Sequence, residues 1–270
     1  MLDIVTVTCK KDKLDMIRQA KSIDKCLDGV RHWVIINDIT QNKLPYDTKN
    51  WYASLSPLYV NNELRIMPIP FTHKDGGYMT QQLCKLWIWQ LIQADYMILD
   101  SKSFFLKPCD ITTDWNHING GCGYVGNYEK LYNGKFIKTI EAYSEKLKLK
   151  TNYEQLAMGV PFIFKNDVMK SVDNWDDLLR FFHADANCEP HITPSEFLLY
   201  SILSKNPKHS GPIPRHCLLM PEHSWLDWEN TLNTWSKPEI LVGSIHRDWI
   251  DNLTQSELTI VNTWLADQGF

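Results

Sequence analysis

The sequence lacks the patterns that define several large classes of protein. Its seven cysteines include no C-x-x-C pair, so neither a four-thiolate zinc site nor a complete disulfide framework is indicated. No apolar run approaches the roughly 18 residues of a membrane-spanning helix, and no secretory leader is recognisable at the start. A net charge of −4 gives no general attraction to nucleic acid. We therefore expect a cytoplasmic protein with reduced cysteines, no membrane span and no nucleic-acid partner.

Glycine is missing at one position where a class of nucleotide-binding enzymes needs it. A nucleotidyltransferase on a Rossmann-like sheet would carry a Gly-rich, phosphate-cradling loop directly after its first strand. The stretch "VTVTCKKDK", residues 5–13, contains no glycine. This absence ranks a nucleotidyltransferase low among the candidate functions.

Apolar segments alternate with helical patterns over the first hundred residues. Buried strands are predicted at residues 2–9 and 32–38, and a further strand at residues 63–70. The intervening helix has Leu14, Ile17 and Ile23 among its apolar positions, and Asp12 is available as its N-cap. This β-α-β order predicts parallel strands joined by right-handed crossovers, and therefore an α/β sheet.

A second helix and a fourth strand complete this Rossmann-like half. The helix is predicted over residues 79–93, with Leu91 on its apolar stripe and Gln82 and Lys85 among its polar positions. Residues 111–270 are less regular, but they contain no repeat and no flexible linker. We therefore expect one compact domain of two halves, residues 1–110 and 111–270.

The fourth strand ends on an acid. In "YMILDSKSFFLKP", residues 96–108, Asp100 follows four apolar residues, and the carboxyl ends of parallel strands are where ligands of such sheets gather. In an extended chain Asp100 and Lys102 would share one side and Ser101 the other. Two acids at this spacing would bind a divalent cation that bridges a diphosphate, but the second residue here is a lysine. The alternative is an ordinary aspartate that caps the turn after a strand.

Three segments resemble a known family. "GGYMTQQLCKLWIWQLIQADYMILDSKSFFLKP", residues 76–108, is similar to the part of GT-A glycosyltransferases in which a helix leads into a strand that ends D-x-D, especially in a poorly characterised bacterial and phage family. "PSEFLLY", residues 194–200, resembles that family's P-S-E-Y-x-L-Y, and "VIIND", residues 34–38, resembles the end of its second strand. The resemblance runs in the right order over roughly residues 2–205.

The resemblance implies a GT-A (Rossmann-like) fold, with a mixed, mostly parallel sheet flanked by helices. It also implies a nucleotide-diphosphate sugar as donor, most simply a UDP-sugar, assisted by Mn²⁺ or Mg²⁺. Asp100 falls on the first acid of D-x-D and Lys102 on the second, where such enzymes hold the metal. A late histidine, His246, could complete the metal shell together with Asp100. The expected donor-binding residues are Thr8, Asn37, Asp38, Gly77, Lys85, Asp100, Ser101 and Lys102.

Glu196 is the candidate catalytic base. Transfer by single displacement needs a carboxylate that takes a proton from the acceptor hydroxyl, and GT-A enzymes often keep it at a helix start in the second half. The competing interpretation is a capping box, with Thr193 as N-cap and Glu196 at the third helical position. Thr254 and Glu257 repeat that pattern before the final helix.

The other candidates also have plain alternatives. Lys85 could be a solvated helix residue, and Thr8, Asn37 and Asp38 could serve strand-end turns. The functional hypothesis is a glycosyltransferase acting on a carbohydrate or other acceptor that enters through residues 111–270, with the stereochemical outcome open. The alternative is a nucleotide-sugar binding protein that has lost transfer, because Lys102 replaces a metal ligand.

Overall fold

The structure is a computed structural model, and it describes most of the predicted elements. The described residues are 2–37, 46–69, 77–111, 122–123, 135–149, 156–157, 161–178, 195–204, 216–219, 228–245, 251 and 253–270. They divide into two compact units, each assembled from separate stretches of chain: unit 1 is Met1–Pro68, Leu99–Thr112 and Pro212–Phe270, and unit 2 is Ile69–Ile98 and Thr113–Gly211. The assignment of donor and acceptor binding to residues 1–110 and 111–270 stays a prediction.

Unit 1 contains the predicted parallel strands. β1 (Asp3–Thr8) pairs in parallel with β2 (Arg31–Ile36), which pairs in parallel with β3 (Glu63–Pro68). All six residues of β1 are buried, as its β-branched sequence predicts. The predicted β-α-β order is confirmed, with α1 (Lys13–Cys26) between the first two strands. The register places Thr8 opposite Ile36, so β1 and β2 end at the same edge.

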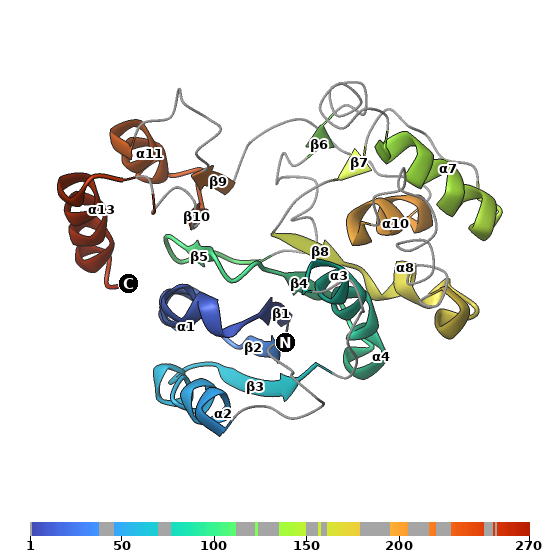
Figure 1. The fold of residues 1–270 in the computed structure, drawn as a ribbon, viewed down its shortest axis with the longest axis horizontal. Coiled ribbons are helices and arrows are strands. Elements are labelled where there is room, and N and C mark those ends of the chain that lie inside the picture. Colours follow the sequence, from blue (N-terminus) through green and yellow to red (C-terminus); the bar gives the residue numbers. More distant parts are fainter. Residues whose placement is uncertain are drawn as a thin grey trace. The chain divides into compact units, whose positions relative to one another are not determined.

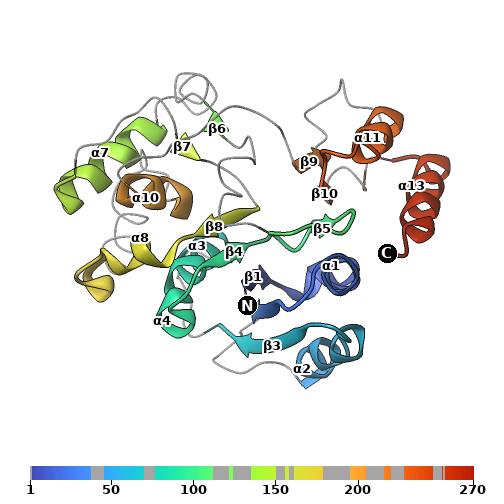
Figure 2. The ribbon, with the colours of Figure 1, turned by 180° about the vertical axis from the view of Figure 1, so that it is seen from behind.

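Helix α1 lies beside β1 and β5 (Ser103–Phe105), as both ribbon views show (Figures 1 and 2). Ile23 is fully buried and Ile17 is partly buried, which confirms the predicted apolar face in part; Met16 is also fully buried. Leu14 is 75% exposed, so its assignment to that face is wrong. Gln19 is buried on this helix although it is polar.

Unit 1 also contains a smaller sheet near the end of the chain. β10 (Val242–Ile245) pairs in parallel with β9 (His216–Leu219) and antiparallel with β5. Helices α11 (Trp228–Trp235) and α13 (Gln255–Asp267) pack beside each other at this sheet (Figure 2). The predicted capping box of the final helix is confirmed, because the Thr254 hydroxyl accepts from the Glu257 amide while the Glu257 carboxylate accepts from the Thr254 amide.

Gly243 allows this small sheet to pack closely. A Cβ atom at this position would lie 3.0 Å from Cε2 of Trp235 and 3.2 Å from Cζ of Phe104. Both side chains are buried and cannot swing into solvent. Gly243→Ala is expected to lower the free energy of unfolding by about 1–3 kcal/mol, measured by urea denaturation. Leu14→Ala, at an exposed helix position, is the control and should change it by less than about 0.5 kcal/mol.

Unit 2 is built around helices and an antiparallel strand pair. β4 (Tyr96–Ile98) pairs with β8 (Phe162–Phe164), and both strands are buried. Helix α10 (Glu196–Leu203) packs against α3 (Gly77–Trp87), α7 (Lys135–Leu147) and α8 (Asn166–Lys170). The remaining described elements of unit 2 are α4 (Trp89–Ile92), β6 (Cys122–Gly123) and β7 (Leu156–Ala157).

The predicted helix over residues 79–93 is two helices, α3 and α4. Gln93 adopts a left-handed conformation with φ 48°, which ends α4. Leu91 is 51% exposed, so its place on the apolar stripe is wrong, and Gln82 and Lys85 are buried rather than solvated. The cysteines Cys26 and Cys84 are buried free thiols, as predicted, and burial raises the pKa of the Cys26 thiol to about 11.

Candidate functional site

The chain leaves β4 at Leu99 and turns at once. The Leu99 amide donates to the carbonyl oxygen of Val5 in β1 at 3.0 Å, which brings the following residues to the carboxyl end of that strand. The Ser103 amide then donates to the carbonyl oxygen of Asp100 at 2.9 Å, closing a turn over residues 100–103. We call this segment the Asp100 turn. The backbone of this segment is a turn and not an extended strand, so the assumption behind the predicted alternation of these side chains is wrong.

The turn nevertheless places the Asp100 and Lys102 side chains together and the Ser101 side chain apart from them, as predicted. The Lys102 ammonium lies 3.9 Å from Oδ2 of Asp100, and the two side chains are 26% and 30% exposed. The Ser101 hydroxyl instead donates to Oδ2 of Asp12 at 3.0 Å. The turn therefore presents one ammonium and one carboxylate together, both partly accessible to solvent.

Asp12 joins the end of β1 to the Asp100 turn. Besides Ser101, its Oδ2 atom accepts from the Thr8 hydroxyl at 3.2 Å and from the Cys9 amide at 3.3 Å. Asp12 occupies the predicted N-cap position of α1, but its side chain makes no capping hydrogen bond to that helix. This linking role was not predicted from the sequence, where the available signal was a carboxylate four residues after a strand-end hydroxyl.

The end of β2 lies beside the end of β1. The Asn37 amide donates to the carbonyl oxygen of Thr8 at 2.7 Å. The structure thus gathers five predicted donor-site residues at one edge of unit 1, namely Thr8, Asn37, Asp100, Ser101 and Lys102. Asp38 and His246 lie outside the described residues.

A second predicted pair meets inside unit 2. The Lys85 ammonium lies 3.0 Å from Oε1 of Glu196, although the residues are 111 positions apart. Lys85 is 5% exposed and Glu196 1% exposed, and the Gln82 amide group also faces the Glu196 carboxylate. The Lys85 ammonium lies 5.7 Å from the centre of the Phe197 ring. The expectation that Lys85 is a solvated helix residue is therefore wrong.

The capping interpretation of Glu196 is also wrong. Helix α10 begins at Glu196, and Ser195 is its N-cap, with its hydroxyl accepting from the Leu198 amide at 3.4 Å. Glu196 therefore occupies the first helical position instead of the third, from which a capping-box carboxylate reaches back. Its carboxylate pairs with Lys85 instead. Gly77, the other predicted donor-site residue in unit 2, begins helix α3.

The described residues do not by themselves fit a divalent-cation site. Mn²⁺ and Mg²⁺ need several oxygen ligands, and no three potential metal ligands gather among the residues that the structure describes. At the Asp100 turn the carboxylate is accompanied by an ammonium, which repels a cation. A metal held by Asp100 and His246 stays a prediction, because His246 lies outside the described ranges.

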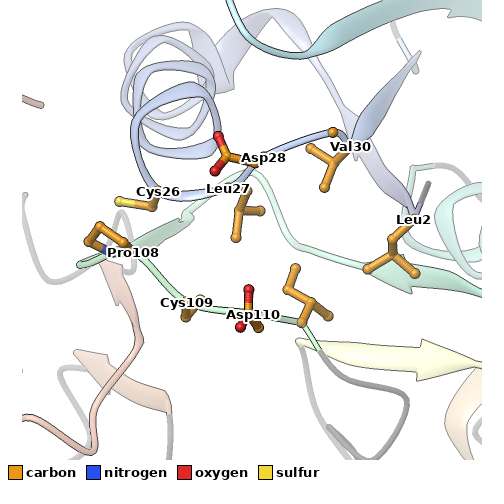
Figure 3. Close-up of a pocket in the computed structure, with 10 residues that line it drawn as sticks. Leu2, Cys26, Leu27, Asp28, Val30, Pro108, Cys109 and Asp110 are labelled. Atoms are coloured by element: carbon orange, nitrogen blue, oxygen red, sulfur yellow. The ribbon is translucent and has the colours of Figure 1, made fainter.

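A pocket of about 500 Å³ opens at the amino ends of β1 and β2, whereas the Asp100 turn lies at their carboxyl ends (Figure 3). Leu2 and Val30, which precede β1 and β2, form part of its apolar lining. Asp28 and Asp110 add two carboxylates. This pocket was not predicted from the sequence. Two carboxylates would repel a diphosphate, so the pocket does not suit the predicted donor.

Comparison with known proteins identifies the fold. No protein-family model and no curated protein matches the chain. Among solved structures, the Q189E active-site mutant of LgtC matches over 98% of this chain and 95% of its own, with a TM-score of 0.52 and 12% identity. The apo form of the glycosyltransferase GlyE from Streptococcus pneumoniae TIGR4 matches over 100% of this chain and 60% of its own, with a TM-score of 0.52 and 9% identity.

These likenesses define the fold as that of GT-A type glycosyltransferases, with a mixed, mostly parallel sheet flanked by helices. The predicted α/β fold class is therefore confirmed. The bifunctional glycosyltransferase WbbM is a further match, over 97% of this chain but only 44% of its own, with a TM-score of 0.47 and 14% identity. None of the described helices is long and apolar enough to cross a membrane.

Proposed function

We propose that the protein is a glycosyltransferase that binds a UDP-sugar at the carboxyl ends of β1 and β2 and transfers the sugar to a carbohydrate or other acceptor. The observation that carries the proposal is the Asp100 turn, which Asp12 ties to the end of β1 and which presents an ammonium and a carboxylate toward solvent. This edge of an α/β sheet is where nucleotide ligands bind. The GT-A fold, shared with LgtC and the glycosyltransferase GlyE, supports glycosyl transfer as the class of reaction.

Each group at this edge has a role that follows from its chemistry. The Lys102 ammonium is suited to the negative charge of a diphosphate, including the charge that develops as the sugar leaves. A carboxylate such as Asp100 accepts hydrogen bonds from sugar hydroxyls. Metal assistance through Asp100 and His246 remains part of the proposal, and Lys102 would share the charge balance with the metal.

Glu196 as general base also remains a prediction. A base must lie within hydrogen-bonding distance of the proton that it takes, and Glu196 is 1% exposed and paired with Lys85. The burial and the pairing therefore favour a structural ion pair between α3 and α10.

A second candidate function is a binding protein that has lost transfer. Lys102 favours it, because the ammonium lies 3.9 Å from the Asp100 carboxylate, the predicted first metal ligand. Such a protein would bind nucleotide sugars without consuming them.

Calorimetry with UDP followed by a transfer assay tests the proposal. We expect saturable UDP binding in the presence of a chelator, because Lys102 supplies positive charge without a metal. Addition of Mn²⁺ measures the metal's contribution to affinity. Incubation with a panel of UDP-sugars, with release of UDP as the readout, should then show turnover. Binding without turnover across the panel favours the binding protein, and no binding of UDP or of any UDP-sugar contradicts both functions.

A further inference from the structure

Helix α1 carries a buried polar stripe that follows the backbone of residues 100–109. The stripe is Gln19, Ser22 and Cys26, which are all buried and spaced to share one helix face. The Ser22 hydroxyl accepts from the Phe105 amide at 3.1 Å, and the Cys26 thiol donates to the Phe105 carbonyl oxygen at 3.8 Å. The Cys26 carbonyl oxygen also accepts from the Cys109 amide at 3.2 Å. Polar side chains on a buried helix face are costly unless they are paired, and these are paired with the segment that contains the Asp100 turn.

Gln19 holds the turn itself. Its amide nitrogen donates to the carbonyl oxygens of Asp100 at 2.7 Å and of Ser103 at 2.9 Å, the two residues that open and close the turn. Both amide hydrogens are thereby used. The reverse orientation of the amide would place an oxygen against two carbonyl oxygens, so this orientation is fixed by the contacts.

The orientation of Gln19 sets the direction of a longer chain of hydrogen bonds. Its side-chain oxygen must accept, and it lies 2.9 Å from the Thr6 hydroxyl, which therefore donates. The Thr6 oxygen must then accept from Nε2 of His32 at 2.9 Å. Nδ1 of His32 is left as the acceptor for the Tyr59 hydroxyl at 2.5 Å.

Every donor in this chain points toward the Asp100 turn. The sequence of donors is Tyr59, His32, Thr6 and Gln19, and the last acceptors are the two turn carbonyls. His32 is fully buried, and burial lowers its pKa to about 3, so the ring stays neutral and keeps this arrangement near neutral pH. The side chain of Gln19 is therefore fixed at both ends.

We propose that Gln19 is a positioning residue that sets the Asp100 turn, and with it the Asp100 and Lys102 side chains, for binding of a diphosphate. This inference rests on the proposed function, because the bound group is the diphosphate of a nucleotide sugar. Glutamine suits the position because one side chain supplies two donors for the carbonyls and one acceptor for Thr6. The residue acts through the turn and touches no ligand itself.

Gln19→Met tests the inference, with Ser22→Ala as the matched control. Methionine keeps the length of the side chain and removes all three hydrogen bonds. Ser22→Ala removes a buried hydrogen bond from the same helix face but leaves the turn held by Gln19. We expect Gln19→Met to raise the Kd for UDP at least tenfold and Ser22→Ala to change it less than twofold. Calorimetry with UDP measures both.

A second readout needs no ligand. Hydrogen-deuterium exchange of the peptide covering residues 99–106 is expected to quicken in Gln19→Met, at the Ser103 amide in particular, and to stay near the wild-type rate at that amide in Ser22→Ala. Gln19→Met with unchanged exchange, or with UDP affinity within threefold of wild type, overturns the inference. Wild-type protein that binds no UDP contradicts the proposed function instead, and the exchange result then still reports whether Gln19 holds the turn.

Thr6→Val covers the case in which Gln19→Met does not fold. It leaves Gln19 in place but removes the donor to the side-chain oxygen, so the amide is fixed at one end only. We expect the Kd for UDP to rise about threefold, together with faster exchange at the turn. A Thr6→Val variant with the affinity and the exchange rates of wild type overturns the inference.

Discussion

Replacing Lys85 with methionine is expected to lower the free energy of unfolding by about 3–5 kcal/mol. Lys85 is the buried partner of Glu196 at 3.0 Å, and the carboxylate is 1% exposed. Methionine has a similar shape but carries no charge, so the Glu196 carboxylate would remain buried without the ammonium. An uncompensated charge in a water-poor interior is costly, because little solvent can reorganise around it. Urea denaturation followed by tryptophan fluorescence measures the loss.

The double variant Lys85→Met and Glu196→Met separates the contribution of the two charges to stability from that of side-chain packing. With both charges removed, most of the lost stability should return, because a buried ion pair is often no more stable than apolar side chains of similar volume. Lys146→Met is the control within unit 2. Lys146 pairs with Asp177 at 3.0 Å, but these side chains are 34% and 57% exposed, so the loss should be below about 1 kcal/mol. A similar small loss for Lys85→Met would contradict the prediction.

The same double variant decides the role of Glu196 in transfer. It lacks the carboxylate but should remain folded, so a loss of activity cannot be assigned to unfolding. Turnover near the wild-type rate excludes Glu196 as the general base. A loss of about 10²–10⁴-fold, with UDP affinity unchanged, is the signature of a missing base.

Lys102→Ala is expected to raise the Kd for UDP by about tenfold to a hundredfold. A hydrogen bond to a charged group contributes about 1.5–3 kcal/mol, and the Lys102 ammonium is 26% exposed and therefore accessible to a diphosphate. Lys107→Ala is the control from the same stretch of chain, because the Lys107 ammonium instead donates to the Lys237 carbonyl oxygen. Calorimetry with UDP should show no change in Lys107→Ala, and equal affinities for the two variants would refute the role of Lys102.

The variant Lys102→Asp tests whether the Asp100 turn can bind a metal ion. It restores the second acid of D-x-D, and two carboxylates at this spacing favour Mn²⁺ or Mg²⁺. We expect UDP binding by this variant to be weak in a chelator and to recover with Mn²⁺, which wild type should not require. Weak binding that Mn²⁺ does not improve would mean that residue 102 does not lie at a metal position.

Local patterns were sufficient to predict the strands and the final helix. β1 and β2 are short and nearly continuously apolar, and such segments are typical of strands covered on both faces. The Thr254 capping box is likewise a signal contained within four residues. The errors at Leu14 and Leu91 arose near helix ends, where a periodic pattern continues into positions that nothing covers.

The candidate site was only partly predictable, because most of it depends on contacts between distant residues. Thr8, Asn37 and Asp100 follow from the rule that parallel strands end at one edge. The pairing of Lys85 with Glu196 joins residues 111 positions apart, and no local spacing predicts it. Gln19 was missed for the same reason, because a polar residue in a helix is usually assigned to solvent. Asp12 was assigned to the helix N-cap, and its contact with Ser101, 89 positions away, was missed.

The Asp100 turn is held through its backbone, including the Lys102 carbonyl oxygen, which accepts from the Ile245 amide, and through the Ser101 hydroxyl. None of these contacts uses the Lys102 side chain. Gln19 binds the carbonyls of Asp100 and Ser103, and Asp12 binds the Ser101 hydroxyl. A change from acid to lysine at position 102 therefore requires no rebuilding of the main chain. One loop conformation therefore suits either an acid or a lysine at position 102, so a single substitution exchanges one means of neutralising phosphate for another.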